Sequence, residues 1–270
     1  MNSIAFIGGG NMASCLIAGL LANGYRREQL SVSDPGDAAR RNLQEHHQIT
    51  ASNDNCAAVC DADVVVLAVK PQLIADIAQD LSAALKPGCA VVSIAAGVPL
   101  SALEDWMGGE TAIVRAMPNT PAMVLHGATG LFANNHVSSP QRQSIEQIFN
   151  AVGCVCWLQS EKQVNAVTAV SGSGPAYFFL LFEIMQRAAE ELGLPAATAR
   201  ELVLQTARGA TEMAQTASID PAELRRQVTS PGGTTQRALE TLDQGGLEQL
   251  VKRAMYAAVE RAEEMSNDHS

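Results

Sequence analysis

The sequence predicts an α/β fold in two parts, a mostly parallel sheet over residues 1–160 and an all-helical part over residues 161–270. In the first part, short β-branched runs alternate with helical patterns, as expected for βαβ units. After about residue 160 the strand pattern stops and only the helical period continues. Hydrophobic residues make up 47% of the 270 residues, which is enough for a buried core.

Seven segments of the first part are predicted strands. The run Val64–Val69 is apolar at every position, which is typical of a strand covered by helices on both faces. The predicted strands are Ile4–Gly8, Leu30–Ser33, Val64–Val69, Ala90–Ser93, Ala112–Ala116, Gly127–Ala133 and Gly153–Leu158. The predicted helices between them are Asn11–Asn23, Gly36–His46, Asn55–Cys60, Gln72–Ala84 and Gln141–Val152. We expect the last two strands to extend the sheet at one edge.

The second part contains six periodic segments. The predicted helices are Glu161–Val170, Pro175–Leu192, Ala196–Gln215, Pro221–Val228, Thr234–Asp243 and Leu247–Met265. Because no low-complexity linker separates the two parts, we expect them to pack closely and share a cleft.

Composition excludes several classes of function. A net charge of −10 argues against a nucleic-acid partner, because nucleic-acid binders present a basic face. The most apolar stretch, Ala176–Met185, is preceded by Gly-Ser-Gly-Pro, so we expect no membrane span. The N-terminus lacks a basic segment and a cleavage site, which favours a cytoplasmic location. The six cysteines lie among apolar residues and are predicted to be buried, and no metal site is expected.

A glycine-rich motif follows the first predicted strand. Gly8–Ala13 matches G-x-G-x-x-G/A, opens a predicted helix, and is followed by a second strand that ends near Asp34. A glycine-rich turn without a ligand is the alternative, but this context favours a Rossmann-type dinucleotide site, with the pyrophosphate at the helix N-terminus. The residues expected at the cofactor here are Ile7, Gly8, Gly9, Gly10, Asn11 and Met12.

The end of the second strand leaves the choice between NADH and NADPH open. Asp34 could accept a hydrogen bond from the ribose 2′-hydroxyl, which favours NADH. Ser33 and Asn55, with Arg40 and Arg41 nearby, could instead surround a 2′-phosphate. For the two arginines an exposed helix face is an equally good explanation.

Further candidates follow the later strands, at the sheet edge where open α/β folds bind ligands. Pro71 forces a turn that places Lys70 near the crevice, although a solvated loop lysine is the alternative. Arg115 is predicted to form a structural charge pair. The other residues expected at the cofactor are Ala68, Val69, Lys70, Pro71, Ala95, Ala96, Gly97 and Asn119.

Two Gly/Ser-Pro segments are predicted to break the helical part. Ser171–Tyr177 and Ser230–Thr235 each end in a helix start, where backbone N–H groups lack partners and hydroxyls stand beside them. A small carboxylate would fit such a site. Ordinary capping, with Pro175 at the first helical position, is the alternative for one such loop. Two of them near a dinucleotide site favour a substrate pocket.

Taken together, these motifs resemble those of the pyrroline-5-carboxylate reductases of proline biosynthesis. The matching segments are Ile4–Ala13, Ala68–Pro71, Ala95–Val98, Arg115–Pro121, Ser171–Tyr177 and Ser230–Thr235. The resemblance implies reduction of the cyclic imine 1-pyrroline-5-carboxylate to L-proline by hydride from NADPH or NADH. It also implies a homodimer with interlocked helical parts, which in some members assembles into a larger ring of dimers.

The resemblance also implies roles for individual residues. Thr234 and Thr235 match positions that bind the substrate carboxylate and the region of the ring nitrogen, and the Thr235 hydroxyl and Lys70 are the candidate catalytic groups. Where Gln227 stands the family usually has asparagine, and Asp34 departs from the uncharged or basic residues common at its position. The residues implied at the substrate are Glu161, Gln227, Ser230, Gly233, Thr234 and Thr235.

Two other functions share some of these features. A β-hydroxyacid dehydrogenase typically needs a lysine base on an early helix of its second domain, and no lysine lies between Gly172 and Gly246. A noncatalytic dinucleotide-sensing module would not need the Ser-Pro-Gly-Gly-Thr-Thr segment. The sequence therefore favours the imine reductase.

Overall fold

A computed structural model describes residues 2–267. Their contacts group into two compact units. The first comprises residues up to 175 together with residues from 257 onward, and the second comprises residues 176–256. Residues 161–175, which follow the last strand, thus make most of their contacts with the unit that holds the sheet.

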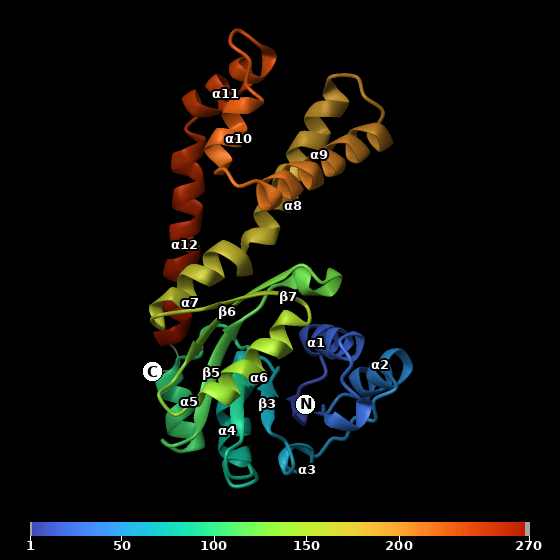
Figure 1. Ribbon diagram of the computed structural model, residues 1–270, viewed down its shortest axis with the longest axis vertical. Coiled ribbons are helices and arrows are strands. Elements are labelled where there is room, and N and C mark those ends of the chain that lie inside the picture. Colours follow the sequence, from blue (N-terminus) through green and yellow to red (C-terminus); the bar gives the residue numbers. More distant parts are fainter. Residues whose placement is uncertain (1, 268–270) are drawn as a thin grey trace. The chain divides into compact units, whose positions relative to one another are not determined.

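The first unit is built on one seven-stranded sheet (Figure 1). Its strands are β1 (Ile4–Ile7), β2 (Leu30–Ser33), β3 (Val64–Leu67), β4 (Ala90–Ser93), β5 (Ala112–Met117), β6 (Gly127–Ala133) and β7 (Gly153–Trp157). Their order is β2-β1-β3-β4-β5-β6-β7, and every neighbouring pair is parallel except β5 and β6. All seven predicted strands and the mostly parallel sheet are confirmed, with β6 and β7 extending one edge.

Helices cover both faces of this sheet because successive side chains of each strand point to opposite faces. Ile4 and Phe6 of β1 belong to one buried cluster, and Ala5 and Ile7 belong to the other. The first cluster includes side chains from α1 (Asn11–Ala22), α2 (Asp37–His47) and α6 (Ser139–Asn150). The second includes side chains from α3 (Asn55–Val59), α4 (Ile74–Ser82) and α5 (Leu100–Met107).

Short 3-10 turns complete the connections of the first unit. The connection between β5 and β6 is short, so β6 returns antiparallel beside β5. Leu125 closes that turn in the left-handed conformation, with φ of 62°. The three 3-10 turns are η1 (Arg27–Gln29), η2 (Pro71–Leu73) and η3 (Thr120–Val124).

The predicted break at Ser171–Pro175 is wrong, because the chain stays helical through it. Helix α7 (Lys162–Val167) runs into a π-helical turn, η4 (Thr168–Gly172), and then into α8 (Gly174–Glu191). The Ser173 N–H donates to the Thr168 carbonyl, five residues back, over 2.8 Å. The backbone N–H groups of the segment Ser171–Pro175 are therefore used inside the helix, so this segment offers no open helix start.

An asparagine from the sheet compensates for the proline in this helix. Pro175 has no N–H for the carbonyl of Ser171, four residues earlier. Asn119, which follows β5, supplies the missing donor, since its Nδ2 lies 3.0 Å from the Ser171 carbonyl oxygen. The helix can therefore continue past Pro175 without leaving that carbonyl unpaired.

The uninterrupted helix is long and apolar. Over Lys162–Glu191 it has 30 residues, a mean hydropathy of 1.3 in its most apolar window, and only 11% of that window buried. By length and composition alone it could cross a membrane, although the core helix of a soluble protein passes the same test. The sequence-based reason for excluding a span, an interruption before Ala176, does not hold.

The second unit is entirely helical in the residues described. It contains most of α8, then α9 (Ala196–Thr216), α10 (Pro221–Gln227), α11 (Thr234–Gln244) and the first part of α12 (Leu247–Asn267). These predicted helices are confirmed. Many large apolar side chains lie exposed on these helices or next to them, among them Phe178, Phe179, Leu180, Leu192, Met213 and Tyr256. Apolar surface of this extent marks a face that binds another protein.

The prediction that all six cysteines are buried is wrong. Cys89 is buried, and burial raises the pKa of its thiol to about 11, while Cys15 is half-buried. The exposed thiols are those of Cys56, Cys60, Cys154 and Cys156. The first two lie on or next to the short helix α3, and the last two point outward from β7, an edge strand that is covered on one face only.

Candidate active site

The glycine loop after β1 joins the carboxyl ends of three strands. Gly8 has φ of 98°, and a Cβ placed on it would lie 2.5 Å from the Ala68 carbonyl oxygen, so only glycine fits. The Gly8 N–H donates to the Ser33 carbonyl over 2.8 Å, and the Ala68 N–H donates to the Ile7 carbonyl over 2.7 Å. The predicted residues Ile7, Gly8, Ser33 and Ala68 are therefore brought together at one sheet edge.

The start of α1 is open. Gly10 is the N-cap residue and is exposed, and a Cβ built on it would meet nothing within 4 Å. No side chain caps this helix, and no acidic residue lies in its first turn. The amides of Asn11 and Met12 therefore face open space at the positive end of the helix dipole, a suitable place for a pyrophosphate.

Asp34 follows β2 directly and borders the glycine loop. Its Oδ2 accepts a hydrogen bond from the Gly9 N–H over 2.7 Å, and its Oδ1 accepts one from the Gly36 N–H over 2.7 Å. Ser33, by contrast, is only 1% exposed, and its hydroxyl has no hydrogen-bond partner among residues 2–267. Asn55 is the first residue of α3 and is half-buried. Asp34 is thus the side chain of the β2 end that meets the loop.

The segments after β3 and β4 lie at the same edge. Lys70 is exposed, follows Val69, and precedes Pro71, which begins η2. Lys70 forms no ion pair within the described residues. After β4, Ala95 and Ala96 lead into Gly97.

Gly97 shows a contact that sequence reasoning missed. It has φ of 77°, and a Cβ there would lie 2.8 Å from Cβ of Met265. The end of α12 therefore packs on the loop after β4, although Met265 lies far from this loop in the sequence. No local pattern predicts this contact, because nothing in either segment identifies the other.

The Asn119 side chain makes two hydrogen bonds within the protein. Its Oδ1 accepts from the Ala128 N–H over 2.8 Å, while its Nδ2 donates to the Ser171 carbonyl. With 8% of its surface exposed, it joins β6 to the π-helical turn. Neither hydrogen bond involves a ligand, so the expected contact between Asn119 and a nicotinamide stays a prediction.

Arg115 and Glu161 form a largely buried ion pair. The Arg115 guanidinium, 6% exposed, contacts Glu161 Oε1, and the same oxygen accepts from the Leu100 N–H over 2.6 Å at the start of α5. The structural charge pairing predicted for Arg115 is confirmed. Sequence reasoning placed Glu161 near the substrate but missed this pairing, because the two residues lie in separate elements.

We expect removal of the Glu161 carboxylate to destabilise the first unit. In Glu161→Ala, the buried Arg115 loses its partner, and the free energy of unfolding should fall by about 2–4 kcal/mol. Urea denaturation followed by circular dichroism measures it. The matched control is Asp37→Ala, which breaks the more exposed pair with Arg40 and should cost less than about 1 kcal/mol. Equal losses in the two variants would contradict the buried-pair role.

The predicted substrate segment in the second unit forms a tight turn before α11. Gly232 has φ of 70°, its N–H donates to Gln236 Oε1 over 2.7 Å, and the Gly233 N–H donates to the Ser230 carbonyl over 3.0 Å. Gly233 is the N-cap residue and has no capping side chain. The amides of Thr234 and Thr235 therefore start the helix without a partner inside it, beside their own hydroxyls.

This segment confirms the predicted helix start at Thr234. No acidic side chain lies in the first turn of α11. Gln227 ends α10, shortly before the turn. The turn therefore combines unpaired N–H groups, two hydroxyls and a positive helix end, which together suit a small carboxylate.

One cavity of about 520 Å³ lies beside the glycine loop. Ser14 and His47 face each other there, with Ser14 Oγ 2.7 Å from His47 Nε2. Burial lowers the pKa of His47, and the nearby charge of His46 lowers it further. The lining residues are Gly9, Gly10, Asn11, Ser14, Cys15, Ala39, Asn42, His46, His47 and Met123. The glycine loop thus borders a space large enough for part of a ligand.

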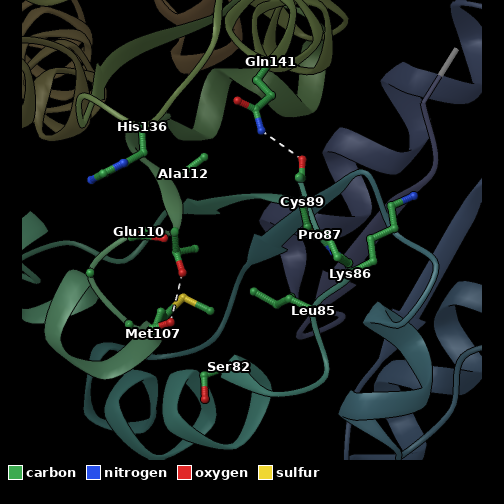
Figure 2. Close-up of a pocket in the computed structure, with 14 residues that line it drawn as sticks. Ser82, Leu85, Lys86, Pro87, Cys89, Met107, Glu110, Ala112, His136 and Gln141 are labelled. Carbon is green, nitrogen blue, oxygen red and sulfur yellow. Dashed lines mark hydrogen bonds between the residues drawn. The ribbon is translucent and has the colours of Figure 1, made fainter.

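Another cavity of about 520 Å³ lies at the opposite edge of the sheet (Figure 2). Cys89 and Ala112, which line it, stand at the amino ends of β4 and β5, and Gln141 Nε2 donates to the Gly88 carbonyl over 3.0 Å. Open α/β sheets bind their ligands at the carboxyl ends of the strands. This cavity is therefore separate from the candidate site.

A parallel sheet with a glycine loop, an open helix start and an acidic residue after β2 defines a dinucleotide-dependent oxidoreductase of the Rossmann type. Comparison with known proteins identifies the family within that class. Residues 161–265 match the family model for pyrroline-5-carboxylate reductase dimerisation, and residues 3–97 match that for NADP oxidoreductase, coenzyme F420-dependent.

Relatives match over nearly the whole chain. A pyrroline-5-carboxylate reductase of Pseudomonas aeruginosa is 51% identical over 263 residues, covering 97% of this chain and 96% of the relative. The solved structure of such a reductase from Coxiella burnetii has a TM-score of 0.94 and 45% identity, covering 98% of each chain. That of the Plasmodium falciparum enzyme with NADP bound has a TM-score of 0.87 and 30% identity, also covering 98% of each chain.

The chain belongs to the pyrroline-5-carboxylate reductases, which reduce 1-pyrroline-5-carboxylate to L-proline with NADPH or NADH. The family resemblance in its motifs is thereby confirmed. A 3-hydroxyisobutyrate dehydrogenase of Mycobacterium tuberculosis shares only the fold, with 17% identity and a TM-score of 0.54. This likeness therefore supports a shared architecture and does not support a β-hydroxyacid dehydrogenase activity.

Proposed function

We propose that residues at the carboxyl edge of the sheet hold the dinucleotide and that the turn before α11 holds the substrate. The observation that carries this proposal is the start of α11, where unpaired amides and the hydroxyls of Thr234 and Thr235 stand together. A carboxylate is the group such an arrangement binds, and 1-pyrroline-5-carboxylate carries one.

The cofactor is held largely by backbone. The glycine loop allows close approach of the pyrophosphate, and the first turn of α1 stabilises its charge. When bound, the reduced nicotinamide supplies the hydride for the C=N carbon. The residues that we propose for this site are Ile7, Gly8, Gly9, Gly10, Asn11, Met12, Ser33, Asp34, Asn55, Ala68, Val69, Lys70, Pro71, Ala95, Ala96, Gly97 and Asn119.

The substrate is positioned by the second unit. The N–H groups at the start of α11 donate hydrogen bonds to its carboxylate, which fixes the ring, and the Thr235 hydroxyl donates a proton or a hydrogen bond to the ring nitrogen. Lys70 contributes a positive charge at the cofactor edge. Because an imine nitrogen is more basic than a carbonyl oxygen, a hydroxyl is a sufficient donor. The residues proposed to bind the substrate are Glu161, Gln227, Ser230, Gly233, Thr234 and Thr235.

The chain acts as a homodimer through its helical part. Support comes from the dimerisation model over residues 161–265 and from the exposed apolar side chains of α8 and α12. We propose that these faces, including the apolar helix over Lys162–Glu191, pack against a second copy and not against lipid. We propose further that the boundary between the cofactor-binding part and the substrate-binding part falls between residues 160 and 161. We also propose that dimers can assemble into a ring. The enzyme is proposed to work in the cytoplasm without a nucleic-acid partner.

An assay with the purified chain tests this function. Initial rates are measured with 1-pyrroline-5-carboxylate and either NADH or NADPH, and L-proline is quantified by chromatography. We expect one L-proline for each reduced dinucleotide consumed. If neither cofactor is oxidised in the presence of the substrate, the proposed function is wrong.

A further inference from the structure

We infer that Asp34 makes NADH the preferred hydride donor and discriminates against NADPH. The inference rests on the proposed function, because it requires the dinucleotide to lie on the glycine loop. It concerns the one chemical difference between the two cofactors, the 2′-phosphate on the adenosine ribose. In Rossmann-type sites this ribose lies at the end of the second strand, where Asp34 stands.

The Asp34 carboxylate is fixed in place by the backbone on both sides. Gly9 N–H donates to Oδ2 and Gly36 N–H donates to Oδ1, each over 2.7 Å. Two such bonds use one lone pair on each oxygen and leave the others free to accept from ribose hydroxyls. To make room for a phosphate, the side chain would have to break both bonds and leave two backbone donors without their acceptor.

The Asp34 side chain lies in contact with the glycine loop. A Cβ built on Gly9 would lie 2.8 Å from Leu43 Cδ1, 3.5 Å from Asp34 Cβ and 3.6 Å from Asp34 Oδ2. The carboxylate is therefore packed against the loop that carries the pyrophosphate. A 2′-phosphate at the ribose would bring negative charge next to this carboxylate, and the two would repel each other.

The nearest cation does not offset this repulsion. The Arg40 guanidinium donates to the Asp34 carbonyl over 2.6 Å and pairs with Asp37. Its charge is thus already balanced by a carboxylate. Arg41 is exposed and forms no ion pair among the described residues, so it is the one nearby arginine left for a phosphate.

Binding measurements without substrate test the inference directly. Isothermal titration calorimetry with NADH and with NADPH gives the two Kd values for the wild-type protein, for Asp34→Asn and for Glu45→Gln. We expect the wild type to bind NADH at least about tenfold more tightly than NADPH, and Asp34→Asn to reduce that ratio by about tenfold. Glu45→Gln removes one negative charge from the exposed surface of α2, away from Arg40, and should change the ratio by less than about threefold.

The outcomes separate this inference from the proposed function. Equal or tighter binding of NADPH by the wild type, or equal shifts in Asp34→Asn and Glu45→Gln, would overturn the role of Asp34. A loss of NADPH affinity in Arg41→Ala larger than about tenfold, with NADH unaffected, would also overturn it by showing a built phosphate site. Tight NADH binding without reduction of 1-pyrroline-5-carboxylate would leave the inference standing and contradict the proposed function.

Discussion

Thr235→Ala is expected to lower kcat with 1-pyrroline-5-carboxylate by about 100-fold, which is the usual contribution of a positioned proton donor. Thr235 lies in the first turn of α11, where the backbone N–H groups have no partner inside the helix. The dinucleotide is proposed to bind on the other unit, so its Kd should change by less than about twofold. Steady-state rates with saturating cofactor, together with titration of the cofactor, measure the two quantities.

Two further variants separate chemistry from folding. Thr235→Ser keeps the hydroxyl and should restore most of the rate. Thr241→Ala removes the same group from the same helix, where its hydroxyl only donates to the Arg237 carbonyl over 3.0 Å, and should leave kcat nearly unchanged. Undiminished turnover in Thr235→Ala would exclude the proposed role, and so would a comparable loss in Thr241→Ala.

The sheet could be predicted from the sequence because its local patterns and its packing agree. Strands such as β3 are apolar at every position, because helices cover both faces of the sheet. The glycine loop was predictable for the same reason, because Gly8 meets a backbone requirement that no other residue satisfies.

The helical part was less predictable because its helices depend on contacts distant in sequence. Ser171–Pro175 looks like a break when taken alone, but Asn119 supplies the hydrogen bond that Pro175 cannot make. The pairing of Arg115 with Glu161 is likewise invisible to local patterns. By contrast, the turn before α11 was predicted correctly, because Gly232 and Gly233 determine it within six residues.

Gly8→Ala is expected to lower the free energy of unfolding by about 2–4 kcal/mol, since it adds backbone strain to a steric clash. At φ of 98° an alanine is strained whatever the space around it, and its Cβ would lie 2.5 Å from the Ala68 carbonyl oxygen. Relief requires β1 and β3 to separate at the edge that binds the dinucleotide. Urea denaturation measures the first effect, and NADH titration of the folded fraction should show weaker binding.

Gly10→Ala distinguishes the structural from the ligand-binding requirement for glycine in the same loop. Gly10 has φ of −71°, and a Cβ there would meet nothing within 4 Å, so stability should change by less than about 0.5 kcal/mol. The added methyl group would nevertheless occupy space that the pyrophosphate approaches, and the Kd for NADH should rise about tenfold or more. Unchanged affinity in Gly10→Ala would contradict the proposal that the open side of the loop meets the cofactor. Unchanged stability in Gly8→Ala would contradict the structural requirement for glycine at position 8.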